Sequence, residues 1–318
     1  MRVLSAMQPS GQLHLGNYFG SMKPNLDFLA QSEDSYFFIA DLHALTSVQD
    51  PALLRQYRED AILGYLAAGF DPKKAVIFYQ SEVPEHTELL WILSTVSPVG
   101  LLERAVSYKE KVEKGISASV GLFAYPVLQA ADILLYGADK VPVGKDQKQH
   151  VEMARDIAIK FNNQFGEVLT VPEPVIGEEV AVVPGIDGQK MSKSYGNTIP
   201  LFGDEKEVKK AIMGIVTDSK EKDDPKDPET CIIYQIHRLM LGKKEALALA
   251  KEYRSGLPYG EAKKKLFQSY MEFFGPMRQR REVISLKEAR HVLDEGAKKA
   301  RFAAQKTMEE VRRAIGLR

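Results

Sequence analysis

The first half of the sequence alternates between short runs of apolar residues and longer stretches with helical periodicity, and this pattern limits the fold more than any other feature. The apolar runs predict strands at residues 2–7, 36–40, 76–80, 141–144 and 181–185. Helices are predicted from Leu15 onward, from Pro51 to about Gly69, across residues 85–135 and from about Asp146 to Phe165. Strands that are apolar throughout are buried on both faces, so the alternation predicts a doubly wound α/β domain with a parallel sheet.

The strand pattern ends near residue 200, and the rest of the chain is predicted to be helical. Helices are expected at residues 204–216, 228–241, 243–253 and 260–274, with a long one after Pro276. A chain of 318 residues is long enough for two domains. We therefore predict an α/β domain over residues 1–190, with a helical insertion at about 91–135, and an α-helical domain over residues 191–318.

The two parts of the chain carry opposite charges, although the whole chain has 43 basic and 43 acidic residues. From Ile186 to the C-terminus there are 28 Lys and Arg against 20 Asp and Glu, which leaves 15 against 23 before it. A locally basic part is expected of a domain that binds a phosphate backbone. A solvated, Lys-rich helical surface explains the same count, so charge alone leaves both interpretations open.

Composition excludes several classes of site. Cys231 is the single cysteine, so neither an internal disulfide nor a site with several thiolate ligands, such as an iron–sulfur cluster, is possible within the chain. Asp41 and His43 lack a third ligand, and no metal site is predicted. We find neither a charged leader followed by a long apolar stretch nor an apolar run of membrane length, so we expect a cytoplasmic protein without a membrane partner.

The first candidate site is the loop QPSGQLHLGN, residues 8–17, between the first predicted strand and its helix. Such a loop opens at the carboxyl edge of a parallel sheet, where ligands of open α/β sheets bind. His14 and Asn17 lie across the first helical turn, whose free N–H groups suit a phosphate. An ordinary turn with a capping Asn would explain this segment alone. Neither the dinucleotide nor the P-loop fingerprint occurs.

The second candidate site is QKMSKSYGN, residues 189–197, which follows the last predicted strand. Lys190 and Lys193 can meet phosphoryl oxygens as positive charges, and Ser192 and Ser194 can add hydrogen bonds. A loop of lysines and serines is by itself usually just solvated. The pairing with HLGN near the N-terminus makes the signal specific.

In this order and spacing, the motifs QPSG, HLGN, AADILLYGAD, VPVGKDQKQH and KMSKS resemble the tryptophanyl-tRNA synthetases, members of class I of the aminoacyl-tRNA synthetases, and the resemblance covers essentially the whole chain. It implies a Rossmann-type catalytic domain, with residues 191–318 as an anticodon-binding domain. The implied enzyme is a ligase that converts ATP and L-tryptophan to tryptophanyl-adenylate and pyrophosphate, with Mg²⁺, and then transfers the amino acid to tRNA(Trp). A homodimer formed through the insertion is also implied.

The resemblance assigns the triphosphate to His14, Lys190 and Lys193, which would stabilise the charge that develops at the α-phosphate. The implied ATP-binding residues are Gln8, Pro9, Ser10, Gly16, Asn17, Gly144, Lys145, Asp146, Val182, Met191, Ser192 and Ser194. From the residues alone, Asp146 is also explained as a helix N-cap and Val182 as an ordinary strand residue. Lys109 and Lys111 either approach the phosphates or lie on an exposed helix.

Asp132 lies in the apolar helix AYPVLQAADILLY, so its carboxylate must be hydrogen-bonded or face a cavity. The resemblance implies that it accepts the indole N–H of tryptophan, the one polar group of that side chain. Capping of a neighbouring loop is the alternative. The other implied tryptophan-binding residues are Leu4, Ala6, His43, Gln129, Val141, Val143 and Gln147. Gln129 replaces the Met often found there, which predicts a more polar wall.

Two other functions remain open. Tyrosyl-tRNA synthetase shares the fold and an Asp near position 132, but it usually carries another His or Lys near Asn17. A catalytically silent, RNA-binding paralogue should show damage at His14, Lys190 or Lys193, and all three are intact. The sole tryptophan, Trp91, is expected in the core or in an interface. The candidates for tRNA contact are Arg278, Arg280, Arg281 and Lys287, which a solvated helix face explains equally well.

Overall fold

A single parallel sheet organises the N-terminal part of the computed structural model, which describes residues 2–29, 34–105, 108, 119–138, 140–143, 148–176 and 182–318. Its strands are β1 (Arg2–Met7), β2 (Asp34–Ile39), β3 (Val76–Tyr79), β4 (Lys140–Val143) and β5 (Glu173–Ile176). They lie in the order β3-β2-β1-β4-β5, and every pairing is parallel. The order reverses between β1 and β4, which predicts a ligand crevice at their carboxyl ends. The predicted fold class is confirmed.

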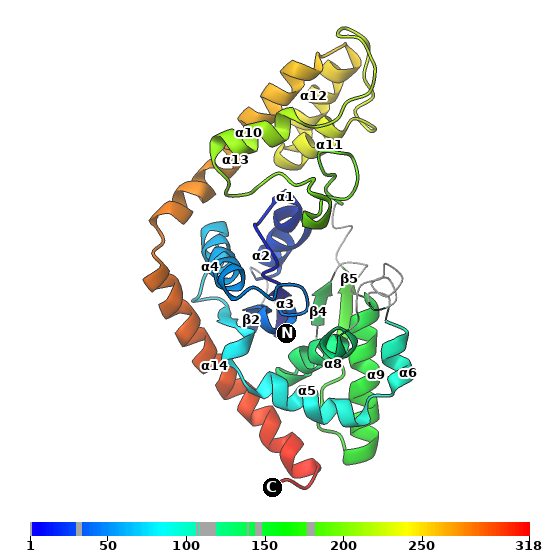
Figure 1. Cartoon of the computed structure of the whole chain (residues 1–318), viewed down its shortest axis with the longest axis vertical. Helices are drawn as coiled ribbons and strands as arrows, with labels where there is room; N and C mark the ends of the chain where they lie inside the picture. Colours follow the sequence, from blue (N-terminus) through cyan, green and yellow to red (C-terminus); the bar gives the residue numbers. More distant parts are fainter. Residues whose placement is uncertain are drawn as a thin grey trace.

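Helices cover both faces of this sheet (Figure 1). In the N-terminal part they are α1 (Leu15–Asn17), α2 (Lys23–Leu29), α3 (Asp41–Ala44), α4 (Pro51–Ala68), α5 (Glu85–Val96), α6 (Val99–Glu103), α8 (Val120–Leu135) and α9 (Lys148–Phe165). The π-helical turn η1 (Tyr18–Met22) joins α1 to α2, and the 3₁₀ turn η2 (Gln80–Glu82) follows β3. Neighbouring residues of β2 face opposite sides, so Phe37 packs in the cluster that includes α4, and Phe38 in the cluster with α5, α8 and α9.

The C-terminal part is helical, with α10 (Glu205–Met213), α11 (Ile232–His237), α12 (Lys243–Arg254), α13 (Tyr259–Val283) and α14 (Leu286–Ala314). Figure 1 shows α10 to α13 together at one end of the molecule and α14 running back along the sheet to the opposite end. Ala300 and Ala304 of α14 share a buried cluster with Phe38 and Phe78 of the sheet. The division at residue 190 stays a prediction, and α14 packs on the N-terminal side of that division.

One predicted strand is wrong over its described residues. Of residues 182–185, Pro184 alone takes part in β pairing, as an isolated antiparallel bridge to Lys190. The fifth strand is instead β5, whose sequence EPVI is short and contains Pro174. Proline lacks an N–H for the ladder and is tolerated in an edge strand, which is the position of β5 beside β4. The prediction missed this strand because its sequence does not read as a central one.

The helix break predicted at Pro276 is also wrong, because α13 continues through it to Val283. Pro276 is exposed, so the carbonyl that loses its N–H partner in the helix can be solvated, while Phe274 and Met277 are buried on either side and anchor both halves. The break comes at Ser285, which caps α14: its hydroxyl accepts from the backbone N–H of Glu288 at 3.1 Å.

Three of the four basic residues proposed for tRNA contact are bonded within the chain. Arg278 donates to the carbonyls of Leu201 and Gly203, and Arg280 to the carbonyl of Ala67 at 2.8 Å. The remaining residue of the three, Arg281, forms an ion pair with Asp60 of α4 at 2.6 Å. The bonds of Arg280 and Arg281 hold α13 against the N-terminal part, and those of Arg278 hold it against residues 201–203. Among the helices that the structure describes, none is both long and apolar enough to cross a membrane.

We expect Gly296→Ala to destabilise the protein by about 3 kcal/mol, because overpacking against a rigid backbone is costly. A Cβ at position 296 would lie 1.8 Å from the carbonyl oxygen of Ile77 in β3, so α14 would have to move off the sheet. Gly260→Ala in α13 is the matched control, since a Cβ there meets nothing within 4 Å and should leave the stability unchanged or raise it by up to about 1 kcal/mol through helix propensity. Urea unfolding measures both, and equal stabilities would contradict the close packing of α14.

Candidate active site

Backbone pairing brings the two candidate sites together. The Leu15 N–H donates to the carbonyl of Ile199 at 3.0 Å, and the Leu201 N–H donates to the carbonyl of Leu13 at 2.8 Å. His14 therefore lies opposite Pro200 in an antiparallel bridge. The loop after β1 and the segment after KMSKS, which are almost two hundred residues apart in sequence, form one structural unit.

Side chains of the second motif contact the first. Lys193 donates from Nζ to the carbonyl of Gly11 at 3.0 Å, and the Gly16 N–H contacts Sδ of Met191 at 3.3 Å. Gly11 has φ of +140°, and a Cβ there would lie 2.9 Å from Cδ of Lys193. Glycine is therefore required at position 11 for two reasons, the backbone conformation and the close approach of the lysine.

The centre of this unit is cationic and has unused hydrogen-bonding capacity. Burial, together with the charge of Lys193, lowers the pKa of His14 to about 4. Burial lowers the pKa of Lys193 to about 8. Among the residues that the structure describes, His14 Nδ1 is buried without a hydrogen-bond partner and no carboxylate is ion-paired with Lys193. A neutral imidazole and an unneutralised ammonium side by side suit an anionic ligand.

Asn197 organises the KMSKS loop and was not predicted. Its Oδ1 accepts from the Ser192 N–H at 2.8 Å, and its Nδ2 donates to Oδ1 of Asp187 at 2.8 Å and to the carbonyl of Lys190 at 3.2 Å. The hydroxyls of Ser192 and Ser194 are 2.8 Å apart. An Asn after a glycine in a turn was the available signal, since its side chain often bonds loop backbone. Lys190 itself is exposed.

Asp132 of α8 lies in a second, buried polar cluster. Its Oδ1 accepts from Gln80 Nε2 and His86 Nδ1, each at 2.7 Å, and its Oδ2 contacts His43 Nε2 at 2.9 Å. Burial would raise the pKa of the Asp132 carboxyl, but the hydrogen bonds from His43 and His86 outweigh it and hold the pKa at about 2. Tyr136 completes the cluster through a 2.8 Å bond to His86 Nε2.

The other residues predicted for the site differ in how far they are exposed. Leu4 and Val141 are buried, Ala6 is exposed, and Gln129 is half-buried on α8 beside Asp132. Gln8 donates to the carbonyl of His43 at 3.2 Å, which links the two clusters. Pro9 is buried, whereas Ser10 and Val182 are exposed, Val182 by 69%. The residues that lie outside the described ranges are Lys109, Lys111, Gly144, Lys145, Asp146 and Gln147, together with the side chain of Val143.

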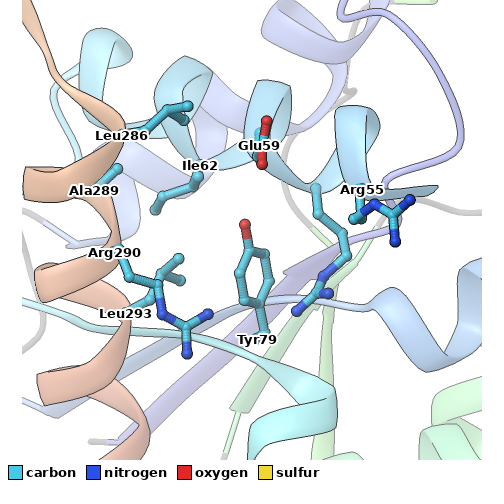
Figure 2. A pocket seen from close by; sticks show the side chains of 9 residues that line it. Arg55, Glu59, Ile62, Tyr79, Leu286, Ala289, Arg290 and Leu293 are labelled. Carbon is cyan, nitrogen blue, oxygen red and sulfur yellow. The ribbon is translucent and has the colours of Figure 1, made fainter. Parts of the chain in front are cut away.

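Outside these two clusters we considered one cavity and possible metal sites. A cavity of about 330 Å³ lies between α4, β3 and α14, where Figure 2 shows Tyr79 facing Arg290. Two of its three cations are already paired, Arg58 with Asp41 at 2.9 Å and Arg290 with Glu82 at 2.7 Å, and none of its lining residues belongs to the clusters above. Within the described part of the chain, no group of three His, Cys, Asp or Glu could hold a metal ion.

Comparison with known proteins agrees with this geometry. Residues 1–275 match the family model described as tRNA synthetases class I (W and Y). The chain therefore belongs to the class I tRNA synthetase family for tryptophan and tyrosine. Within it, the chain is 50% identical to a tryptophan–tRNA ligase of Fusobacterium nucleatum, over 99% of this chain and 98% of that one. It is 51% identical to a tryptophan–tRNA ligase of Campylobacter jejuni, over the whole length of both.

Solved structures lead to the same family. The crystal structure of tryptophanyl-tRNA synthetase from Campylobacter jejuni, complexed with ADP and tryptophan, superposes with a TM-score of 0.93 at 50% identity and covers 99% of this chain and 100% of that chain. The enzyme from Mycoplasma pneumoniae gives 0.84 at 31% identity, covering 99% of this chain and 97% of that chain. The predicted resemblance is confirmed.

The lowered pKa of His14 predicts a pH-dependent stability. Its ordinary pKa is 6.5, so between pH 6.5 and about 4 the unfolded chain binds more protons than the folded one. The free energy of unfolding should therefore fall as the pH is lowered through this window, by up to about 3 kcal/mol. His14→Gln should flatten that fall in urea titrations. Parallel curves for the two proteins would contradict the burial of a neutral imidazole. His237, whose pKa burial also lowers to about 4, is common to both proteins and cancels.

Proposed function

We propose that this chain is a tryptophan–tRNA ligase, which activates L-tryptophan with ATP and transfers it to tRNA(Trp). Full-length identity of about half to tryptophan–tRNA ligases supports the reaction. The observation that carries the chemistry is that His14 and Lys193 come together in one cationic site after β1. The closest alternative in the family, a tyrosine enzyme, is disfavoured because these relatives are all ligases for tryptophan.

The first step places a carboxylate oxygen of tryptophan in line with the α-phosphorus of ATP. The new O–P bond forms as the bond from the α-phosphorus to the bridging oxygen breaks, and pyrophosphate leaves with that electron pair. This step needs no nucleophilic side chain, because positioning and charge stabilisation supply most of the catalysis. In our proposal Lys193 and Lys190 contribute positive charge to the triphosphate. The His14 imidazole, neutral at physiological pH, donates an N–H from Nδ1, which has no partner among the described residues.

The remaining nucleotide contacts are proposed from the family resemblance. They are Gln8, Pro9, Ser10, Gly16, Asn17, Gly144, Lys145, Asp146, Val182, Met191, Ser192 and Ser194. Mg²⁺ would neutralise charge on the phosphates during the reaction. The described residues around His14 offer nitrogen donors and no carboxylate cluster, so the ion would be held by phosphate oxygens and water.

Tryptophan is proposed to bind with its indole N–H on Asp132. A buried carboxylate rejects analogues without that N–H, since it would lose a hydrogen bond that water cannot replace. The other proposed contacts are Leu4, Ala6, His43, Gln129, Val141, Val143 and Gln147. The bond from Gln8 to the carbonyl of His43 supports the two substrates lying next to each other.

The test is ATP–pyrophosphate exchange with tryptophan and with tyrosine, run side by side. Tryptophan should support the faster exchange, and Asp132→Asn should raise the KM for tryptophan by about tenfold or more while the KM for ATP changes little. Faster exchange with tyrosine would overturn the specificity, and none with either would favour the silent paralogue. An unchanged KM for tryptophan in the variant would remove Asp132 from the site.

We propose that the helical residues 191–318, which begin within the KMSKS loop, form the tRNA-binding domain, and that residues 1–190 carry the adenylate chemistry together with that loop. Of the four basic residues first considered, Lys287 is exposed on α14, while the three arginines already hold α13 in place. A cytoplasmic location follows from the tRNA substrate and stays a prediction.

A homodimer is proposed through α5, α6 and α8, of which α8 packs against both of the others. Trp91 is 72% exposed, so the alternative of a core position is wrong, and Val120 is 82% exposed. Next to them is an apolar groove of about 240 Å³, lined by Leu42, Leu45, Thr46, Leu90, Ser119, Gly121, Ala124, Tyr125 and Leu128. Large apolar side chains gathered on one face are typical of a protein interface, and the occupant that we propose is a second copy of this chain.

Trp91→Glu should convert the dimer to a monomer, because it introduces a charge into an apolar interface. Sedimentation velocity measures the change in mass. Phe302→Glu is the control, since Phe302 is also exposed but lies on α14, and its mass should match the wild type. A wild-type protein that sediments as a monomer would contradict the proposal.

A further inference from the structure

The Asp132 carboxylate has an uneven set of partners. Oδ1 accepts two hydrogen bonds, from Gln80 and His86, while Oδ2 has a single described partner, His43. A carboxylate oxygen accepts about two hydrogen bonds, so Oδ1 is saturated and Oδ2 has room for one more donor. The two bonds on Oδ1 therefore determine which oxygen is presented to a ligand.

The Tyr136 hydroxyl fixes the orientation of the His86 ring. His86 is fully buried, with Nδ1 2.7 Å from the Asp132 carboxylate and Nε2 2.8 Å from the hydroxyl of Tyr136. An ionised carboxylate cannot donate, so Nδ1 carries the proton. Burial raises the pKa of Tyr136 well above its ordinary value, so its hydroxyl keeps the proton that it donates to Nε2. One tautomer of His86 satisfies both neighbours.

Gln80 is held just as firmly. Its Oε1 accepts from the Leu42 N–H at 3.2 Å, which orients the amide so that Nε2 donates to Asp132. Asp41 accepts from the Ser81 N–H at 2.9 Å and from the Ser81 hydroxyl at 2.6 Å, which clamps α3 to the turn after β3. Both donors to Oδ1, Gln80 and His86, are thus held in orientation by a second hydrogen bond of their own.

We propose that His86, oriented by Tyr136, is a positioning residue that sets the specificity for tryptophan by holding Oδ1 of Asp132 so that Oδ2 faces the indole N–H. This rests on the proposed function, in which Asp132 binds the indole. Neither His86 nor Tyr136 has to touch the substrate. The donors hold the carboxylate before the substrate arrives, so binding does not have to order it, and an analogue without the N–H leaves it incompletely satisfied.

The experiment compares tryptophan with its benzothiophene analogue, in which sulfur replaces the indole N–H, in ATP–pyrophosphate exchange. The measured quantity is the ratio of kcat/KM for the two substrates. His86→Leu should lower this ratio by about tenfold, because a hydrogen bond to a charged group is lost. His86→Asn should restore most of it, because the Asn Nδ2 can take the place of Nδ1. Tyr136→Phe should lower it by about threefold.

Tyr65→Phe is the matched control, because its hydroxyl is buried without a hydrogen-bond partner among the described residues and is remote from Asp132. Its ratio should equal that of the wild type. A merely structural role of His86 would reduce exchange with both substrates equally and leave the ratio unchanged, which would overturn the proposal. If His86→Leu does not fold, an unchanged ratio in Tyr136→Phe has the same meaning.

Failure of the proposed function gives a different result. A wild-type chain without tryptophan-dependent exchange would overturn both proposals. A ratio unaffected by Asp132→Asn would remove Asp132 from the site and with it the positioning role, while the proposed reaction would stand. A ratio that collapses in Asp132→Asn and is unchanged in both His86→Leu and Tyr136→Phe would overturn the positioning role alone.

Discussion

The backbone pairing of residues 13–15 with residues 199–201 is the contact on which the nucleotide site depends. The sheet alone brings the loop after β1 to the carboxyl edge of its strands, but it does not determine where the KMSKS segment lies. The pairing places Lys193 over Gly11 and Met191 against Gly16. Both cationic and N–H donors then face one volume, so a triphosphate can be bound by groups from the two ends of the catalytic part.

The Asp132 cluster and the site of His14 and Lys193 differ in whether their charged groups have partners within the protein. Asp132 is enclosed by donors that favour its ionised form, so its position is settled before any ligand binds. His14 is buried with one nitrogen left without a partner among the described residues, Lys193 is half-buried, and their lowered pKa values show what burial without a counter-charge costs. A rigid, satisfied group suits recognition of one neutral N–H, whereas an unsatisfied cationic group suits an anionic substrate that supplies the missing charge.

The predictions from sequence were most accurate where the sequence signal is local. Four strands and helix α4 were placed within two residues, because continuous apolar runs and the sequence DP before a helix are local signals. The strand β5 and the passage of α13 through Pro276 were missed, since proline is tolerated at a sheet edge and on an exposed helix face. Gln80, His86 and Tyr136 were missed because they come from separate elements with no shared motif.

The sequence by itself determined the alternating α/β architecture, the two phosphate-handling motifs and the family to which the chain belongs. Local periodicity and short motifs carry this information, because each depends on residues a few positions apart. Tertiary structure alone decided that α14 returns to pack on β3 and that His86, itself bonded to Tyr136, donates a hydrogen bond to Asp132. Those contacts join residues 46 or more positions apart, and close packing of particular side chains selects them, a property that no local pattern encodes.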